Sequence, residues 1–165
     1  MKLHSDNFSE VSFVSNKVIE VKLKSDATDE EWEGLCTAMK RIYAKCDAEN
    51  LEFFACYDVR FIDLKYDQLM TGLCMFEALR PTTKRLCKRT VLIVSPNIMS
   101  FVEFAFSWYK PSKPVDFVNS PEEAEHFFKK KNPKKHEATE SASTGSSSDP
   151  PIICYCDANF TSDSS

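Results

Sequence analysis

The chain contains 165 residues, 42% of them hydrophobic and 13 of them Phe, which is enough for one domain with its own core and excludes a wholly disordered protein. Most of the formal net charge of −4 falls in residues 132–165, so the preceding part is nearly neutral. A nearly neutral domain lacks the basic surface that nucleic acids attract, and we therefore expect no nucleic-acid partner.

The first predicted elements are two short strands and a helix. Residues 11–15 and 19–23 alternate apolar and polar side chains around a turn, which predicts a hairpin with one solvent-exposed face. Thr28 is followed at the spacing of a capping box by an acidic residue, so a helix is expected to begin there. From Trp32 to Cys46, apolar residues recur every three or four positions. This spacing predicts an amphipathic helix.

Two short apolar runs, 51–57 and 90–94, are typical of central strands that are covered on both faces. Each run is followed by an apolar pattern with helical spacing. The first of these helices is expected to end near Pro81, because the residue before a proline avoids the helical conformation. The second is predicted to span 98–109.

The last predicted elements are a short strand and a helix. Residues 115–118 form a short apolar run, and Ser120, Pro121 and Glu123 together have the pattern of a complete helix start. The resulting order, β-β-α-β-α-β-α-β-α, predicts an α/β domain over residues 6–131. Its mixed sheet is expected to have four or five strands and to be covered by about four helices.

The closing segment, Pro114 to Phe128 (PVDFVNSPEEAEHFF), consists of a short apolar strand, a small polar residue and a Glu-Glu-Ala string. By this segment and by its element order, the chain resembles the STAS domain, the anti-sigma-factor-antagonist-like fold of SpoIIAA, over about residues 8–130. The resemblance implies a STAS-like sandwich with a regulatory, non-enzymatic role in binding proteins or small ligands. Leu64 and Lys65 stand where the family has phosphorylatable serines, so the phosphorylation switch is not carried over.

Four charged residues, Asp58, Arg60, Asp63 and Lys65, follow the strand predicted at 51–57. They lie beyond its carboxyl end, where open α/β sheets usually bind ligands. Asp58 and Asp63 also correspond to acidic positions of the STAS motif. These residues are therefore a candidate ligand or partner loop. An ordinary solvated loop is the alternative.

A basic cluster lies before the strand predicted at 90–94; it consists of Arg80, Lys84, Arg85, Lys88 and Arg89. Such a cluster can bind a phosphate, a lipid headgroup or an acidic partner. Cations near a helix C-terminus, where the helix dipole favours them, are the simpler explanation.

The helix predicted at 98–109 is apolar on more than one face. Its core stripe is complete without Phe104 and Trp108, which lie one turn apart on its flank. An ordinary surface helix is not apolar so far around its circumference. Either this helix is unusually buried, or Phe104 and Trp108 form a ridge that binds a protein partner or lipid.

Residues 132–165 are rich in Ser, Thr, Lys, Glu, Gly and Pro, which predicts a disordered acidic tail. An apolar segment at 151–156, with Ile152, Ile153 and Tyr155, interrupts this tail. The segment is expected either to fold back as an edge strand or to be a short motif that a partner binds by strand addition.

The seven cysteines are an odd number and mostly fall within apolar patterns, which favours reduced thiols over a disulfide framework. No signal peptide and no apolar run long enough to span a bilayer is visible. The expected location is the cytoplasm, with the nucleus as an alternative. Cys154 and Cys156 are too few ligands for a zinc site, so no metal is expected, and lipidation of this pair stays open.

The chain has no nucleophile in a catalytic motif and no Gly-rich phosphate loop, so we predict no catalytic residue and no cofactor. The leading hypothesis is a regulatory or interaction adaptor with a protein partner. The first alternative is a protein that binds a small apolar ligand or lipid in a pocket under the helices, on the order of several hundred Å³. The second alternative is an enzyme that uses Asp58, Arg60 and Asp63. No integral membrane segment is predicted, and peripheral lipid contact is compatible with each hypothesis.

Overall fold

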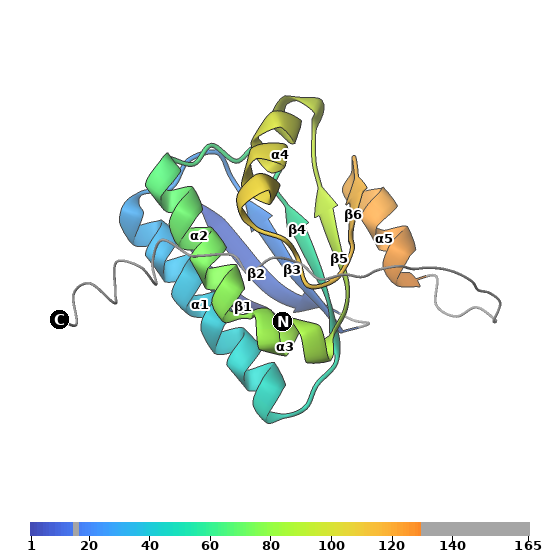
Figure 1. Ribbon diagram of the computed structural model, residues 1–165. Coiled ribbons are helices and arrows are strands. Elements are labelled where there is room, and N and C mark those ends of the chain that lie inside the picture. Colours follow the sequence, from blue (N-terminus) through green and yellow to red (C-terminus); the bar gives the residue numbers. More distant parts are fainter. Residues whose placement is uncertain (15–16, 130–165) are drawn as a thin grey trace.

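The computed structural model describes residues 1–14 and 17–129 (Figure 1). Within these ranges, six strands form one sheet, and helices pack against it. The strands are β1 (Lys2–Ser5), β2 (Ser9–Val14), β3 (Val18–Leu23), β4 (Phe53–Asp58), β5 (Cys87–Ile93) and β6 (Val115–Val118). The helices are α1 (Asp29–Ala48), α2 (Tyr66–Ala78), α3 (Arg80–Leu86), the 3₁₀-helix η2 (Pro96–Ile98), α4 (Met99–Trp108) and α5 (Pro121–Lys129).

The strands lie in the sheet in the order in which they occur in the chain, β1-β2-β3-β4-β5-β6. The first three are antiparallel neighbours, and β3 through β6 are parallel. Each parallel connection contains at least one helix, as a crossover between parallel strands requires. The predicted α/β class, opening hairpin and mixed sheet are therefore confirmed.

Helices α1, α2 and α4 cover one face of the sheet, and α5 lies on the opposite face beside β5 and β6 (Figure 1). β4 alternates between these layers: Ala55 and Tyr57 pack in the larger core, whereas Cys56 packs in the smaller core under α5. The opening hairpin keeps a polar surface on the α5 side, where Lys22 is exposed.

Two helix starts have the predicted capping geometry. At α1, the backbone N–H of Glu31 donates to Thr28 Oγ1 over 3.1 Å, and the N–H of Thr28 donates to Glu31 Oε2 over 2.9 Å. At α5, the N–H of Glu123 donates to Ser120 Oγ over 3.2 Å. These bonds satisfy backbone donors that have no partner within the helix.

The structure has one more strand than the predicted maximum, because β1 was not expected. β1 has few apolar residues, and its backbone joins the edge of the sheet beside β2. The ammonium group of Met1 also donates to the carbonyl of Phe13 over 2.7 Å. Backbone pairing of this kind leaves no apolar pattern in the sequence.

The described residues also contain one α-helix more than the four that were expected, and the additional helix is α3. Helix α2 ends at Ala78, and Pro81 lies in the first turn of α3. A proline in the first turn of a helix loses no hydrogen bond, since its N–H would have no partner there. The residue therefore separates two helices instead of ending helical structure in this region.

Among residues 1–14 and 17–129, no helix is both long and apolar enough to cross a bilayer. Cys36, Cys46, Cys56 and Cys87 are buried and form no disulfide, whereas Cys74 is disulfide-bonded, so the expectation of reduced thiols is wrong for Cys74. The predictions for the tail concern positions outside the described residues, including its apolar residues Ile152, Ile153 and Tyr155 and the two cysteines beside them.

Candidate functional site

A cavity of about 170 Å³ lies between the sheet and the helices α1, α2 and α4. We call it the layer cavity. It is partly open to solvent, and most of the side chains that line it are aliphatic or aromatic. Its volume is slightly above the roughly 150 Å³ of an engineered apolar cavity that binds benzene. The volume is below the several hundred Å³ that the ligand-binding hypothesis anticipated.

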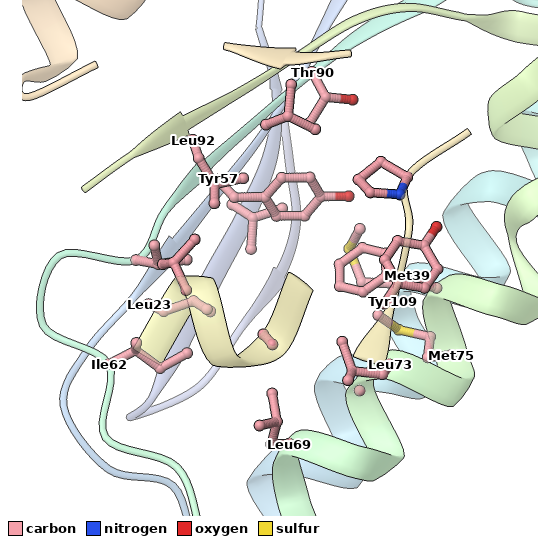
Figure 2. Close-up of a pocket in the computed structure, with 18 of the residues that line it drawn as sticks. Leu23, Met39, Tyr57, Ile62, Leu69, Leu73, Met75, Thr90, Leu92 and Tyr109 are labelled. Carbon is pink, nitrogen blue, oxygen red and sulfur yellow. The ribbon is translucent and has the colours of Figure 1, made fainter. Parts of the chain in front are cut away.

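Side chains of the sheet and of α2 face one another across the layer cavity (Figure 2). Leu23, Tyr57 and Leu92 come from β3, β4 and β5, and Leu69 and Leu73 come from α2. These strand residues share one face because alternate residues of a strand point to the same side of the sheet.

Helix α4 forms a third wall of the cavity. Phe101, Val102 and Ala105 line the space, and Tyr109 lines it directly after the helix. Val102, Ala105 and Tyr109 are buried, which is the stripe that the helical spacing predicted for this segment. Ala105 leaves room beside the sheet because its side chain is a single methyl group.

Helices α1 and α2 together form another wall of the layer cavity, and a close contact between them fixes its position. A Cβ atom on Gly72 would lie 2.7 Å from Cζ2 of Trp32, so only glycine lets the two helices approach this closely. Trp32 also makes an edge-on contact with Phe8, with 5.9 Å between ring centroids. The indole of Trp32 therefore lies between Gly72 of α2 and Phe8, which precedes β2, and it also lines the cavity.

Two tyrosine hydroxyls form a buried hydrogen bond in the cavity wall. The hydroxyls of Tyr43 on α1 and Tyr57 on β4 lie 2.9 Å apart. Burial raises the pKa of Tyr43 well above its usual value and also raises the pKa of Tyr57. Both phenols are therefore neutral at physiological pH, and the pair adds no charge to the apolar wall.

The charged side chains of the predicted strand-end loop lie outside the lining of the layer cavity, whereas Val59, Ile62 and Leu64 of the same loop line it. Asp58 is buried, and its carboxylate accepts two hydrogen bonds from the guanidinium of Arg60, over 2.9 and 2.8 Å. Hydrogen bonding to Asp58 raises the pKa of Arg60. The two charges satisfy each other, and the guanidinium also lies 5.1 Å from the ring centroid of Phe61.

The other two loop residues make separate contacts. The backbone N–H of Asp63 donates to the carbonyl of Ser25 over 2.6 Å, and its side chain is exposed. Nζ of Lys65 lies 3.9 Å from a carboxylate oxygen of Asp29 on α1. The structure thus brings Asp58 and Arg60 together and anchors Asp63 and Lys65 toward α1. All four lie outside the lining of the layer cavity.

The flank of α4 carries the two aromatic residues singled out from the sequence. Phe104 is 44% exposed, and its ring lies 6.3 Å from that of the half-buried Trp108, edge to face. The other flanking residues, Met99 and Phe106, pack against the core. Phe106 also lies 5.9 Å from Phe117 of β6.

Most of the basic cluster is engaged in ion pairs. Arg80 pairs with Glu77, Arg85 with Asp47, Lys88 with Glu52 and Arg89 with Asp116. Lys84 forms no ion pair within the described part of the chain. These pairs account for the cluster as a set of contacts that attach α3 and β5 to their neighbours.

The layer cavity was not located by the sequence patterns. Its lining residues were correctly expected to be apolar and inward-facing, but the same pattern describes a completely filled core. The nearest signal was the excess of apolar residues in the helix predicted at 98–109. Among the described residues, no three His, Cys, Asp or Glu side chains gather as a metal site requires.

Comparison with known proteins gives a match in structure only. Neither protein-family models nor curated protein sequences match the chain. Its structure is similar to that of an uncharacterized DUF3478-family protein with a SpoIIAA-like fold from Shewanella loihica PV-4, with a TM-score of 0.50 and 14% identity over 76% of this chain and 98% of that one. The fold is SpoIIAA-like. The anti-sigma factor antagonist SpoIIAA in its unphosphorylated form also matches, with a TM-score of 0.46 and 11% identity over 75% of this chain and 99% of that one.

The SpoIIAA-like fold confirms the STAS resemblance at the level of architecture. At such low identity, the similarity does not transfer a function. A function for this chain therefore depends on its own residues, above all on those that line the layer cavity.

Proposed function

We propose that this domain binds a small apolar ligand in the layer cavity and has no catalytic role. The observation that carries the proposal is the cavity itself, which lies between an apolar sheet face and three helices. Ligand sites are typically concave and apolar, with a few polar groups that orient the ligand.

The energetic cost of the space supports this proposal. If it were fully enclosed, a space of about 170 Å³ unfilled by side chains would forgo about 4 kcal/mol of stability, taking about 24 cal/mol per Å³, and its partial opening to solvent makes the loss smaller. A whole domain of this size is stable by only about 5–15 kcal/mol. Larger side chains at Ala105 would recover part of this energy, so the cavity is costly in a purely structural domain.

The test is a titration of the full-length protein with 1-octanol, followed by NMR of methyl-labelled Leu, Met and Val. Octanol is expected to shift the signals of cavity residues such as Leu73, Met75 and Leu92. The substitution Ala105→Leu fills the space and should abolish these shifts without lowering stability. Ala44→Leu, at an exposed position of α1, is the matched control and should leave them intact.

The proposal fails if octanol produces no shifts in the wild-type protein. It also fails if the shifts persist in Ala105→Leu with unchanged affinity, because the alcohol would then bind elsewhere. A thermal melt of each variant establishes that it is folded before binding is compared.

Partner binding through the α4 flank is a second candidate function, and it retains the adaptor hypothesis. It is supported by the exposure of Phe104 and by its contact with Trp108, since exposed neighbouring aromatics are typical of protein interfaces. Changing both residues to Ala should cost less than about 1 kcal/mol of stability and should abolish affinity capture of partners by the full-length chain. A large loss of stability would show instead that the pair belongs to the core.

A further inference from the structure

The polar atoms around the layer cavity indicate what kind of ligand it fits. In the described part of the chain, two buried side-chain polar atoms have no hydrogen-bond partner: Nε1 of Trp32 and Oγ of Ser112. Both residues line the cavity. Buried polar groups are nearly always hydrogen-bonded, so the unpaired hydroxyl of Ser112 beside the cavity points to a bound molecule with a polar group at that end. Nε1 of Trp32 stays unpaired if the other end of that molecule is apolar.

The two unpaired atoms lie toward opposite ends of the parallel strands. Trp32 lies in the first turn of α1, which follows the carboxyl end of β3. Ser112 lies in the segment between α4 and β6, which leads to the amino end of a parallel strand. A ligand can therefore lie along the strands, with its two ends in different chemical surroundings.

The Ser112 end has positive charge. Lys113 lines the cavity, and its ammonium group donates to the carbonyl of Cys87 over 2.6 Å. It is the only charged side chain among the described residues of the lining, which contain no carboxylate. The hydroxyls of Thr83 and Thr90 belong to the same lining, and Thr90 is seen at the sheet side of the cavity in Figure 2.

Two further lysines add to the positive charge at this end. Lys84 follows Thr83, and Lys110 precedes Pro111, so each is adjacent in the chain to a residue of the lining. Both are exposed, and neither has an ion-pair partner within residues 1–14 and 17–129. The segment that holds Lys110 is attached to α3, because Arg80 donates to the carbonyl of Lys110 over 2.7 Å.

We infer that the ligand is an alkyl monocarboxylate whose chain occupies the apolar part of the layer cavity and whose carboxylate lies at Ser112 and Lys113. The inference rests on the proposed function and specifies its ligand. Ser112 donates its hydroxyl hydrogen to a carboxylate oxygen, and the ammonium of Lys113 forms a charge-assisted hydrogen bond with the other. The Trp32 end has no cation in its lining, so the carboxylate is favoured at Ser112 and Lys113.

The volume sets the length of the chain. Because about 150 Å³ holds benzene, with six carbon atoms, about 170 Å³ holds roughly seven. Octanoate has seven carbons beyond its carboxylate and is therefore the appropriate probe. 1-Octanol has a chain of similar length without the charge, which makes it the neutral comparison.

The experiment is calorimetric titration of the full-length protein with octanoate and with 1-octanol at pH 7. The wild type is expected to bind octanoate at least about ten-fold more tightly than octanol, since a charged hydrogen bond adds at least that much affinity. Lys113→Met retains the apolar stem and should reduce octanoate binding about ten-fold or more while leaving octanol binding unchanged. Ser112→Ala should act in the same direction with a smaller effect.

Lys40→Met is the matched control, because Lys40 is an exposed lysine of α1 outside the cavity lining, and it should change neither affinity. Equal binding of octanoate and octanol by the wild type would overturn the inference but not the proposed function. If Trp32→Phe weakened octanoate binding while Lys113→Met did not, the assigned orientation would be wrong. Failure of both probes to bind would reject the proposed function itself.

Discussion

The buried tyrosine pair offers a sharp test of how the cavity wall is held together. Tyr43 and Tyr57 are 2% and 7% exposed, and the structure gives each hydroxyl one hydrogen bond, to the other. Tyr43→Phe removes one hydroxyl and leaves the other buried without a partner. Tyr57→Phe removes the hydroxyl of Tyr57 and leaves that of Tyr43 buried without a partner.

The expected magnitudes follow from this geometry. Each single substitution should cost about 1–3 kcal/mol, because it removes a hydrogen bond and leaves a buried polar group unpaired. The double substitution removes both polar groups and should be nearly neutral. Because the two single losses cancel in the double variant, the double-mutant cycle should yield a coupling energy of about 2–6 kcal/mol, far beyond what two independent sites show.

The assay is urea unfolding at pH 7, followed by circular dichroism, for the wild type and the three variants. Tyr66→Phe is the control: Tyr66 is 54% exposed, and its substitution should change stability by less than about 0.5 kcal/mol. The reasoning is refuted if the double variant loses as much stability as the sum of the two single variants. It is also refuted if both single variants are as stable as the wild type.

Three further predictions concern packing, pH and capping. Gly72→Ala places a Cβ 2.7 Å from the Trp32 ring and should destabilise the domain by about 1–3 kcal/mol despite the better helix propensity of Ala; an increase in melting temperature would contradict this. Burial raises the pKa of the Cys56 thiol from 9.0 to about 12, so its stabilising contribution is complete below pH 9 and is lost as pH rises toward 12. Cys56→Ala should therefore flatten the decline of unfolding free energy between pH 9 and 11 by up to about 1.4 kcal/mol per pH unit, and an unchanged slope would contradict this. Thr28→Ala removes the cap of α1 and should cost about 0.5–2 kcal/mol in urea unfolding, whereas Thr37→Ala, at an exposed position of the same helix, should cost less.

The elements that could be predicted from the sequence are those in which a local pattern determines the structure. The capping residue Thr28 and the apolar stripe that begins at Trp32 define α1 without reference to the rest of the chain. The apolar run that contains Cys56 and Tyr57 could be assigned to a central strand because both of its faces are buried. In each case the spacing of side chains carries the information.

The elements that could not be predicted depend on backbone pairing or on a single proline. β1 joins the sheet through main-chain hydrogen bonds, and its side chains from Lys2 to Ser5 carry no strand pattern. Pro81 is compatible with either a helix end or a helix start, and only the packing of α3 decides between them. The Asp58–Arg60 ion pair illustrates the same limit for the candidate site, because proximity in sequence did not show that the two charges satisfy each other.

The ligand-binding hypothesis expected a pocket under the helices, but the sequence patterns could not locate the layer cavity, because a void depends on distances between layers, whereas an apolar pattern indicates only which side chains face inward. Helix α4 contributes both to the layer cavity and to the exposed aromatic flank that the sequence predicted. Ala105 lines the cavity, and Phe104, the residue before it, lies on the exposed flank. The two proposed functions therefore share one helix. If a ligand in the cavity changes the position of α4, it changes how Phe104 and Trp108 are presented, and thermodynamic linkage then requires a partner on that flank to alter ligand affinity by the same factor.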